Sequence, residues 1–133
     1  MAMKRLAIGT VVGAITLQLV GYLIWNIVFD FYFAAIDASG VAREPQLLWA
    51  NMLGNLSLAA LLTLAIDKVG ASTIGRGIKI GAIVGFLVWF GVDFAHYAVM
   101  TVQTLTGTII DPLLELIRYG VTGGVIVAVL KRG

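Results

Sequence analysis

The chain has 133 residues, of which 60% are hydrophobic and 12% charged, with nine Lys and Arg against seven Asp and Glu. A soluble domain is usually about 45–50% apolar and about 25% charged, so this composition excludes a soluble globular protein and indicates that lipid surrounds most of the surface. The lack of cysteine excludes disulfides, thiolate metal sites and iron–sulfur clusters, and a single histidine excludes a site built from several histidines of one chain.

Four apolar stretches are long enough to cross the hydrocarbon layer of a membrane, which takes about 20 residues of helix. They predict spans at about residues 6–33, 46–66, 78–100 and 112–130. The first is longer than the apolar core of a signal peptide, so we expect it to be retained. In the last, Asp111 is the expected N-cap and Pro112 the first helical residue. The predicted fold is an all-α bundle of four transmembrane helices, forming a single integral membrane domain over residues 1–133.

Basic residues collect at one end of the predicted spans, whereas Arg43 falls in a loop at the other end and Arg118 within the fourth span. The seven at the first end are Lys4, Arg5, Lys68, Arg76, Lys79, Lys131 and Arg132. Because cytoplasmic loops are enriched in Lys and Arg, both termini are expected in the cytoplasm of a bacterium, with the chain in its inner membrane. The same charges explain the pI of about 9.2 without nucleic acid as a partner.

The first and third spans share a phrase, which indicates an internal repeat. "GYLIW" occupies residues 21–25 and "GFLVW" residues 85–89, and an aspartate-phenylalanine pair follows each, beginning at Asp30 and at Asp93. The second and fourth spans share a weaker spacing, from Leu47-Leu48 to Gly54 and from Leu113-Leu114 to Gly120. Either apolar sequences match by chance, or two parallel-repeat helical hairpins are related by half a turn about the membrane normal. Duplication would place Trp25 near Trp89 and Asp30 near Asp93.

Glycines at intervals of four predict close helix packing in the half of the bundle that holds the termini. In lipid, helices associate where small residues let their backbones approach. The GxxxG pairs and triplets are Gly9 and Gly13, then Gly77, Gly81 and Gly85, and finally Gly120 and Gly124.

The outer third of every span carries polar side chains at helical spacing. A charge in hydrocarbon costs about 2.5 kcal/mol or more, so we expect these side chains to meet in one layer rather than face lipid. This layer is the candidate site for a ligand or a proton, and its members are Asn26, Asp30, Asn51, Asn55, Asp93, His96, Tyr97, Glu115 and Arg118.

Asp93 and His96 can be interpreted in four ways. They could form a structural hydrogen-bonded pair, a proton-transfer site in which the carboxylate orients the imidazole, or, with Asp30, a weak zinc or manganese site. As a lone membrane histidine, His96 could also ligate a tetrapyrrole, which would need a partner complex. Glu115 and Arg118 form either an ion pair or, through Arg118, an anchor for an anionic group.

Asn51 and Asn55 favour contacts between helices over ligand binding. The sequence contains no nucleophile elbow, phosphate-binding loop or dinucleotide fingerprint, so no catalytic residue and no cofactor is assigned, and the metal content stays open.

With "GYLIW" followed by aromatic residues in the first span and "GFLVWFG" in the third, the chain resembles a broad group of uncharacterised bacterial four-helix membrane proteins. The resemblance implies the four-helix layout and assigns no role to Asp93 or His96.

Three functions fit the polar layer. The preferred hypothesis is a non-enzymatic inner-membrane protein whose outward-facing cavity binds a small ligand, ion or proton, in transport or sensing. The first alternative is a structural accessory subunit of a larger membrane complex, and the second is a membrane enzyme acting on a lipid or quinone. The expected partners are the lipid bilayer and either a second copy of the chain or a larger complex, which mild detergent extraction would distinguish.

Overall fold

The computed structural model describes residues 1–28, 40, 43 and 45–132, and the side chains of 28 and 132 lie outside this description. The helices in chain order are α1 (Met3–Tyr22), which continues into the short π-helix η1 (Leu23–Val28), then α3 (Leu48–Val69), α4 (Ile74–Val99) and α5 (Leu105–Arg132). The four long helices are each long and apolar enough to cross a membrane. The predicted all-α four-helix bundle is therefore confirmed, and the chain has the build of an integral membrane protein.

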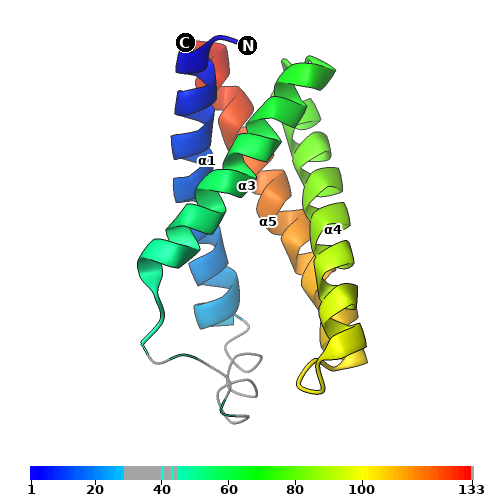
Figure 1. Cartoon of the computed structure of the whole chain (residues 1–133). Helices are drawn as coiled ribbons and strands as arrows, with labels where there is room; N and C mark the ends of the chain where they lie inside the picture. The colour runs from blue at the N-terminus through cyan, green and yellow to red at the C-terminus, as the bar shows by residue number, and fades with distance from the viewer. Residues whose placement is uncertain (29–39, 41–42, 44, 133) are drawn as a thin grey trace.

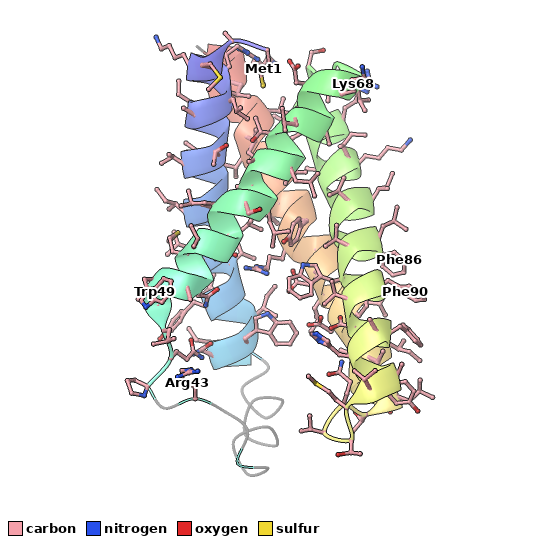
Figure 2. The ribbon with its side chains drawn as sticks, in the orientation of Figure 1. Met1, Arg43, Trp49, Lys68, Phe86 and Phe90 are labelled. Carbon is pink, nitrogen blue, oxygen red and sulfur yellow. The ribbon has the colours of Figure 1, made fainter. Side chains whose placement is uncertain are left out.

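The helices run alternately up and down, so the two termini lie beside each other at one end of the bundle (Figure 1). We call this the terminal end, and the opposite end, at Val28 and Leu48, the distal end. Met1 and Lys68 lie at the terminal end, and Arg43 and Trp49 at the distal end (Figure 2). Helix α5 passes between α1 and α4 in Figure 1 and is the most buried of the four spans. It is therefore the helix around which the others assemble.

Glycines bring the helices together in the terminal half. In α4, a Cβ on Gly77 would lie 2.6 Å from the carbonyl oxygen of Gly123 in α5. Between α1 and α3, a Cβ on Gly13 would lie 2.9 Å from the Cβ of Ala59. Real Cβ atoms essentially never come within 3.0 Å of another such atom, so a side chain at either glycine would force its neighbour to move. Helix backbones therefore touch here, as lipid-embedded helices do at small residues.

The start of α5 differs from the predicted one. The helix begins at Leu105, and Pro112 lies within it instead of at its first position. The Thr104 hydroxyl accepts a hydrogen bond from the Gly107 N–H at 3.0 Å, so Thr104 caps the helix in the role predicted for Asp111. A helix tolerates an internal proline where neighbours satisfy the freed backbone groups, and Pro112 is fully buried. As a result, Asp111 is a helical residue whose side chain faces the bundle.

The distal end of the first span leaves the α-helical path. Residues Leu23–Val28 form the π-helix η1, which carries Trp25 and Asn26. A π-turn places one extra residue in the turn and re-aims the side chains that follow, and such turns are frequent at functional sites. The predicted continuation of this span to residue 33 lies outside the described residues.

Candidate functional site

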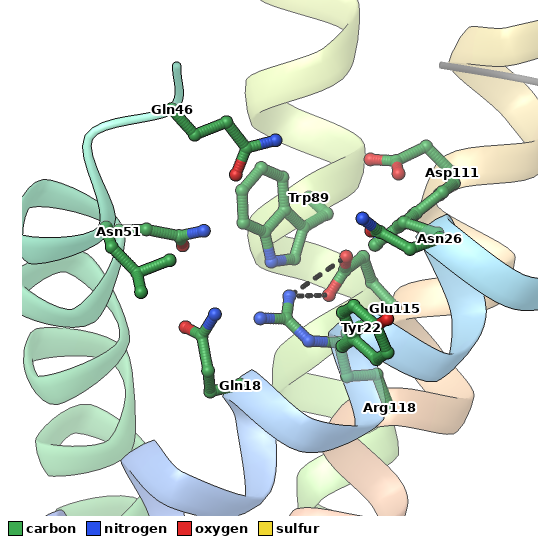
Figure 3. A pocket seen from close by; sticks show the side chains of 12 residues that line it. Gln18, Tyr22, Asn26, Gln46, Asn51, Trp89, Asp111, Glu115 and Arg118 are labelled. Carbon is green, nitrogen blue, oxygen red and sulfur yellow. Dashed lines mark hydrogen bonds and ion pairs between the residues drawn. The ribbon is translucent and has the colours of Figure 1, made fainter. Parts of the chain in front are cut away.

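The distal half contains a cavity of about 400 Å³ between all the helices. Figure 3 shows its lining from close by. The residues that line it are Gln18, Gly21, Tyr22, Trp25, Asn26, Gln46, Leu48, Asn51, Trp89, Asp111, Glu115 and Arg118. Its size is that of pockets that hold small organic molecules, and its wall combines aromatic, amide and charged groups.

Arg118 lines this cavity and is only 8% exposed. One terminal nitrogen donates to both carboxylate oxygens of Glu115, at 3.1 and 2.9 Å, and these bonds are drawn in Figure 3. The Nε–H donates to the carbonyl oxygen of Leu17 at 3.0 Å. Gly21 leaves the room for this group, since a Cβ there would lie 3.1 Å from Nε.

Asn55 and Gln18 extend the network to the other helices. The second terminal nitrogen of Arg118 donates to Oδ1 of Asn55 at 3.1 Å, and Nδ2 of Asn55 donates to Oε1 of Gln18 at 2.7 Å. Hydrogen bonds thus join α5, α3 and α1 at one level. A buried arginine is tolerated only when its donors find acceptors, and here they do.

The charge of Glu115 is fully compensated. Besides the ion pair with Arg118, its carboxylate accepts a hydrogen bond from the side chain of Trp25. Glu115 and Arg118 therefore form an ion pair with no net charge, which is the first of the two interpretations given for them. Most of the N–H groups of Arg118 are directed at protein acceptors.

Three aromatic side chains line the cavity. Tyr22 and Trp25 come from the first span and Trp89 from α4. The Nε1–H of Trp89 donates to the hydroxyl oxygen of Tyr119 at 3.1 Å, which fixes the indole against α5. Trp25 and Trp89 line the same cavity.

A second acidic group lies beside the neutral pair. Asp93 of α4 is 6% exposed, and its carboxyl group neighbours that of Asp111 in α5, which is 8% exposed. Among the described residues, Oδ2 of Asp93 is buried without a hydrogen-bond donor. Asp111 faces the cavity, and Asp93 lies behind it.

The predicted polar layer is only partly assembled. Arg118, Glu115 and Asn55 meet in the network, and Asn26 and Asn51 line the cavity. His96 and Tyr97 are exposed on the outside of α4. The carboxyl group of Asp93 neighbours that of Asp111, and not His96 as one interpretation of the sequence expected. Asp30 lies outside the described residues. Among those described, no three His, Asp or Glu side chains gather as metal ligands.

The important residue that the sequence reasoning missed is Asp111. A signal was present: with a helix capped by Thr104, Asp111 precedes Glu115 by four residues and Arg118 by seven, which places all three on one face. The proline that follows Asp111 concealed this pattern, because it also suits a helix start.

Comparison of the chain with known protein families, with curated proteins and with solved structures found no match.

Proposed function

We propose that this protein binds a small organic cation, a primary or quaternary ammonium ion, in the cavity at its distal end. The observation that carries the proposal is a pair of neighbouring buried carboxyl groups, Asp111 and Asp93, of which Asp111 lines a cavity that aromatic residues also line. Binding of this kind serves transport or sensing of the cation across a bacterial inner membrane.

The charges around the cavity favour a cation. Glu115 and Arg118 form an ion pair with each other, and within the part of the chain that the structure describes Asp111 and Asp93 take part in no ion pair. A charge in a low-dielectric cavity is costly unless an opposite charge neutralises it. Carboxylates at the cavity therefore lower the binding free energy of a positively charged ligand and raise that of an anion.

The wall of the cavity favours an organic cation over a metal ion. Tyrosine and tryptophan rings attract ammonium groups through their electron-rich faces, by about 0.5–2 kcal/mol for each good contact. Tyr22, Trp25 and Trp89 supply three such rings. The amide groups of Asn26 and Asn51 can meet polar substituents of the same ligand.

The proposed orientation has the cavity open toward the outside of the cell. The basic residues lie at the terminal end, so the positive-inside rule puts that end in the cytoplasm. The distal cavity then opens to the external face, where it can take up a solute.

The test is a binding measurement on the full chain in lipid nanodiscs. By isothermal titration calorimetry, choline is expected to bind, whereas its uncharged analogue, in which carbon replaces the quaternary nitrogen, is not. Asp111→Asn removes the carboxylate that lines the cavity and is expected to weaken choline binding by about tenfold or more, equivalent to about 1.4 kcal/mol.

The matched control is Asp67→Asn, the same chemical change at an exposed position at the terminal end of α3. Its affinity for choline is expected to equal that of the wild type. Equal binding of choline and its uncharged analogue, or binding of neither by a folded protein, would overturn the proposal.

A further inference from the structure

We propose that a second cavity, at the terminal end, binds the phosphate group of an anionic phospholipid through Arg5 and Lys131. This cavity has a volume of about 320 Å³ and is lined by residues from the start of α1, the end of α3 with the loop that follows it, and the end of α5. The starts of α1 and the end of α5 lie beside each other there (Figure 1). The site is at the opposite end of the bundle from the distal cavity, so the inference does not depend on the ligand proposed for that cavity.

The lining of the terminal cavity combines charged and apolar side chains. Arg5 and Lys131 are exposed and supply two cations. Ile66, Val127 and Leu130 are buried residues of the apolar core. A phospholipid has the same two parts, because its charged phosphate is joined to an apolar tail. Hydrated inorganic phosphate, in contrast, would gain nothing from the apolar part of the lining.

The backbone of α5 positions Arg5. A terminal nitrogen of its guanidinium group donates to the carbonyl oxygen of Leu130 at 3.1 Å. This carbonyl belongs to the last turn of α5, where no further turn of the helix supplies a donor. Arginine has five N–H donors, and this bond leaves others that can meet phosphate oxygens in pairs. The guanidinium group is thereby held next to the residue that precedes Lys131.

The charges of the terminal end favour an anion. By its sequence this end carries seven basic side chains and one acidic side chain, that of Asp67. Asp67 lines a smaller neighbouring cavity of about 220 Å³, which Arg5 also lines. Within the part of the chain that the structure describes, neither Arg5 nor Lys131 forms an ion pair with Asp67. Basic pockets between transmembrane helices at the membrane surface are suited to anionic headgroups, and this cavity has that position and that charge.

The first experiment uses the wild-type chain, purified in a neutral detergent. By native mass spectrometry, dioleoyl phosphatidylglycerol is expected to bind at least about tenfold more tightly than dioleoylglycerol, which has the same tails and no phosphate. Equal binding of the two lipids would overturn the proposal. Neither lipid carries an ammonium group, so this result is independent of whether choline binds in the distal cavity.

Inorganic phosphate distinguishes the two sources of a phosphate group. Compared with sodium chloride at the same ionic strength, it is expected to leave the binding of phosphatidylglycerol unchanged. If inorganic phosphate displaces the lipid, the cavity is a site for a free phosphate and the proposal of a lipid site fails.

Paired variants test the two cations. Arg5→Gln combined with Lys131→Gln is expected to weaken the binding of phosphatidylglycerol by about tenfold or more. The matched control is Arg76→Gln combined with Lys79→Gln, which removes the same charge at the same end from exposed positions that do not line the cavity. It should stay within about threefold of the wild type. An equal loss in both double variants would indicate attraction to a basic surface in general and would overturn the site.

A single variant preserves the contact between the helices. Lys131→Gln leaves the hydrogen bond from Arg5 to Leu130 in place, so it is expected to fold as the wild type does. It should bind phosphatidylglycerol about fivefold more weakly, the effect of one basic residue at a lipid surface. Wild-type affinity in this variant would contradict the role of Lys131, whatever the fate of the double variant.

Discussion

A guanidinium group buried in a membrane protein needs acceptors for its hydrogens, and Arg118 finds them on three helices. Glu115 is on its own helix, Asn55 on α3, and the carbonyl oxygen of Leu17 on α1. The planar fork of arginine matches this spread of acceptors, whereas the ammonium group of lysine is a point charge on a flexible stem. Arg118 is thus the side chain that fixes the relative positions of three spans.

We therefore expect Arg118→Lys to destabilise the fold although it preserves the charge. The lysine would retain Glu115 but lose at least two hydrogen bonds to α1 and α3, which corresponds to about 2–4 kcal/mol. The measurement is the unfolding of the purified protein in detergent. Arg76→Lys, an exposed position near the start of α4, serves as control and should unfold as the wild type does. Equal stability of the two variants would contradict this role of Arg118.

At the scale of the elements, the contact between α4 and α5 depends on the absence of side chains. A Cβ on Gly81 would clash with the carbonyl group of Tyr119 and lie 3.2 Å from Cα of Gly123. Gly81→Ala must push the two helices apart, and overpacking of this kind costs about 1–3 kcal/mol. A lower unfolding temperature of the purified protein is the expected result.

The same helix provides the control. Gly91 is also in α4, but a Cβ there would have no atom within 4 Å. Gly91→Ala should leave stability unchanged or raise it slightly, because alanine favours helix over glycine by about 0.5–1 kcal/mol. If Gly81→Ala behaves like Gly91→Ala, backbone contact is not what holds α4 against α5.

The spans could be predicted from the sequence because apolar length alone determines where a helix can cross lipid. The direction of each side chain could not. The buried residues of α4 are Gly77, Gly81, Gly85 and Asp93, which face α5. His96 is only about 60° from Asp93 around the helix, but it lies in the last turn of α4, where residues 95–99 are all exposed. Whether a side chain near a helix end is covered depends on how far the neighbouring helices extend, which the pattern of one span does not show.

The sequence also could not predict that Asp111 lies next to Asp93. Whether the two carboxyl groups meet depends on where α5 begins and on how far α4 slides along it. The cap at Thr104 sets the first, and the glycine contacts set the second. Both are properties of packed helices, and neither is visible in the apolar pattern of one span.

Across the whole molecule, duplication stays a prediction, and the helix contacts point to one register in which to test it. Gly77 follows Gly13 by 64 residues, and Gly123 follows Ala59 by the same 64, and these are the residues that touch in the two hairpins. The shared phrases at residues 21 and 85 have this separation too. We predict that an experimental structure will superpose α1–α3 on α4–α5 in this register by half a turn about the membrane normal. A superposition that pairs residues 66 apart, as the leucine pairs do, would contradict this register. A symmetry axis in the membrane plane would contradict the parallel repeat.

The orientation of the molecule decides what the cavity can reach, and the cysteine-free chain makes it measurable. Single cysteines can be placed at Ser72, in the exposed loop at the terminal end, and at Thr101, in the exposed turn at the distal end. In spheroplasts, a membrane-impermeant maleimide is expected to label Thr101→Cys and to spare Ser72→Cys. After lysis both should react, while the wild type stays unlabelled.

The physical reason is the distribution of charge. Moving the terminal end outward would carry seven basic residues across the membrane, whereas the distal end carries Arg43 alone. If Ser72→Cys were labelled in spheroplasts and Thr101→Cys were not, the cavity with Asp111 and Arg118 would open to the cytoplasm. An uptake role for an external cation would then fail, even if choline still bound to the purified protein, because the same site would meet only solutes of the cell interior.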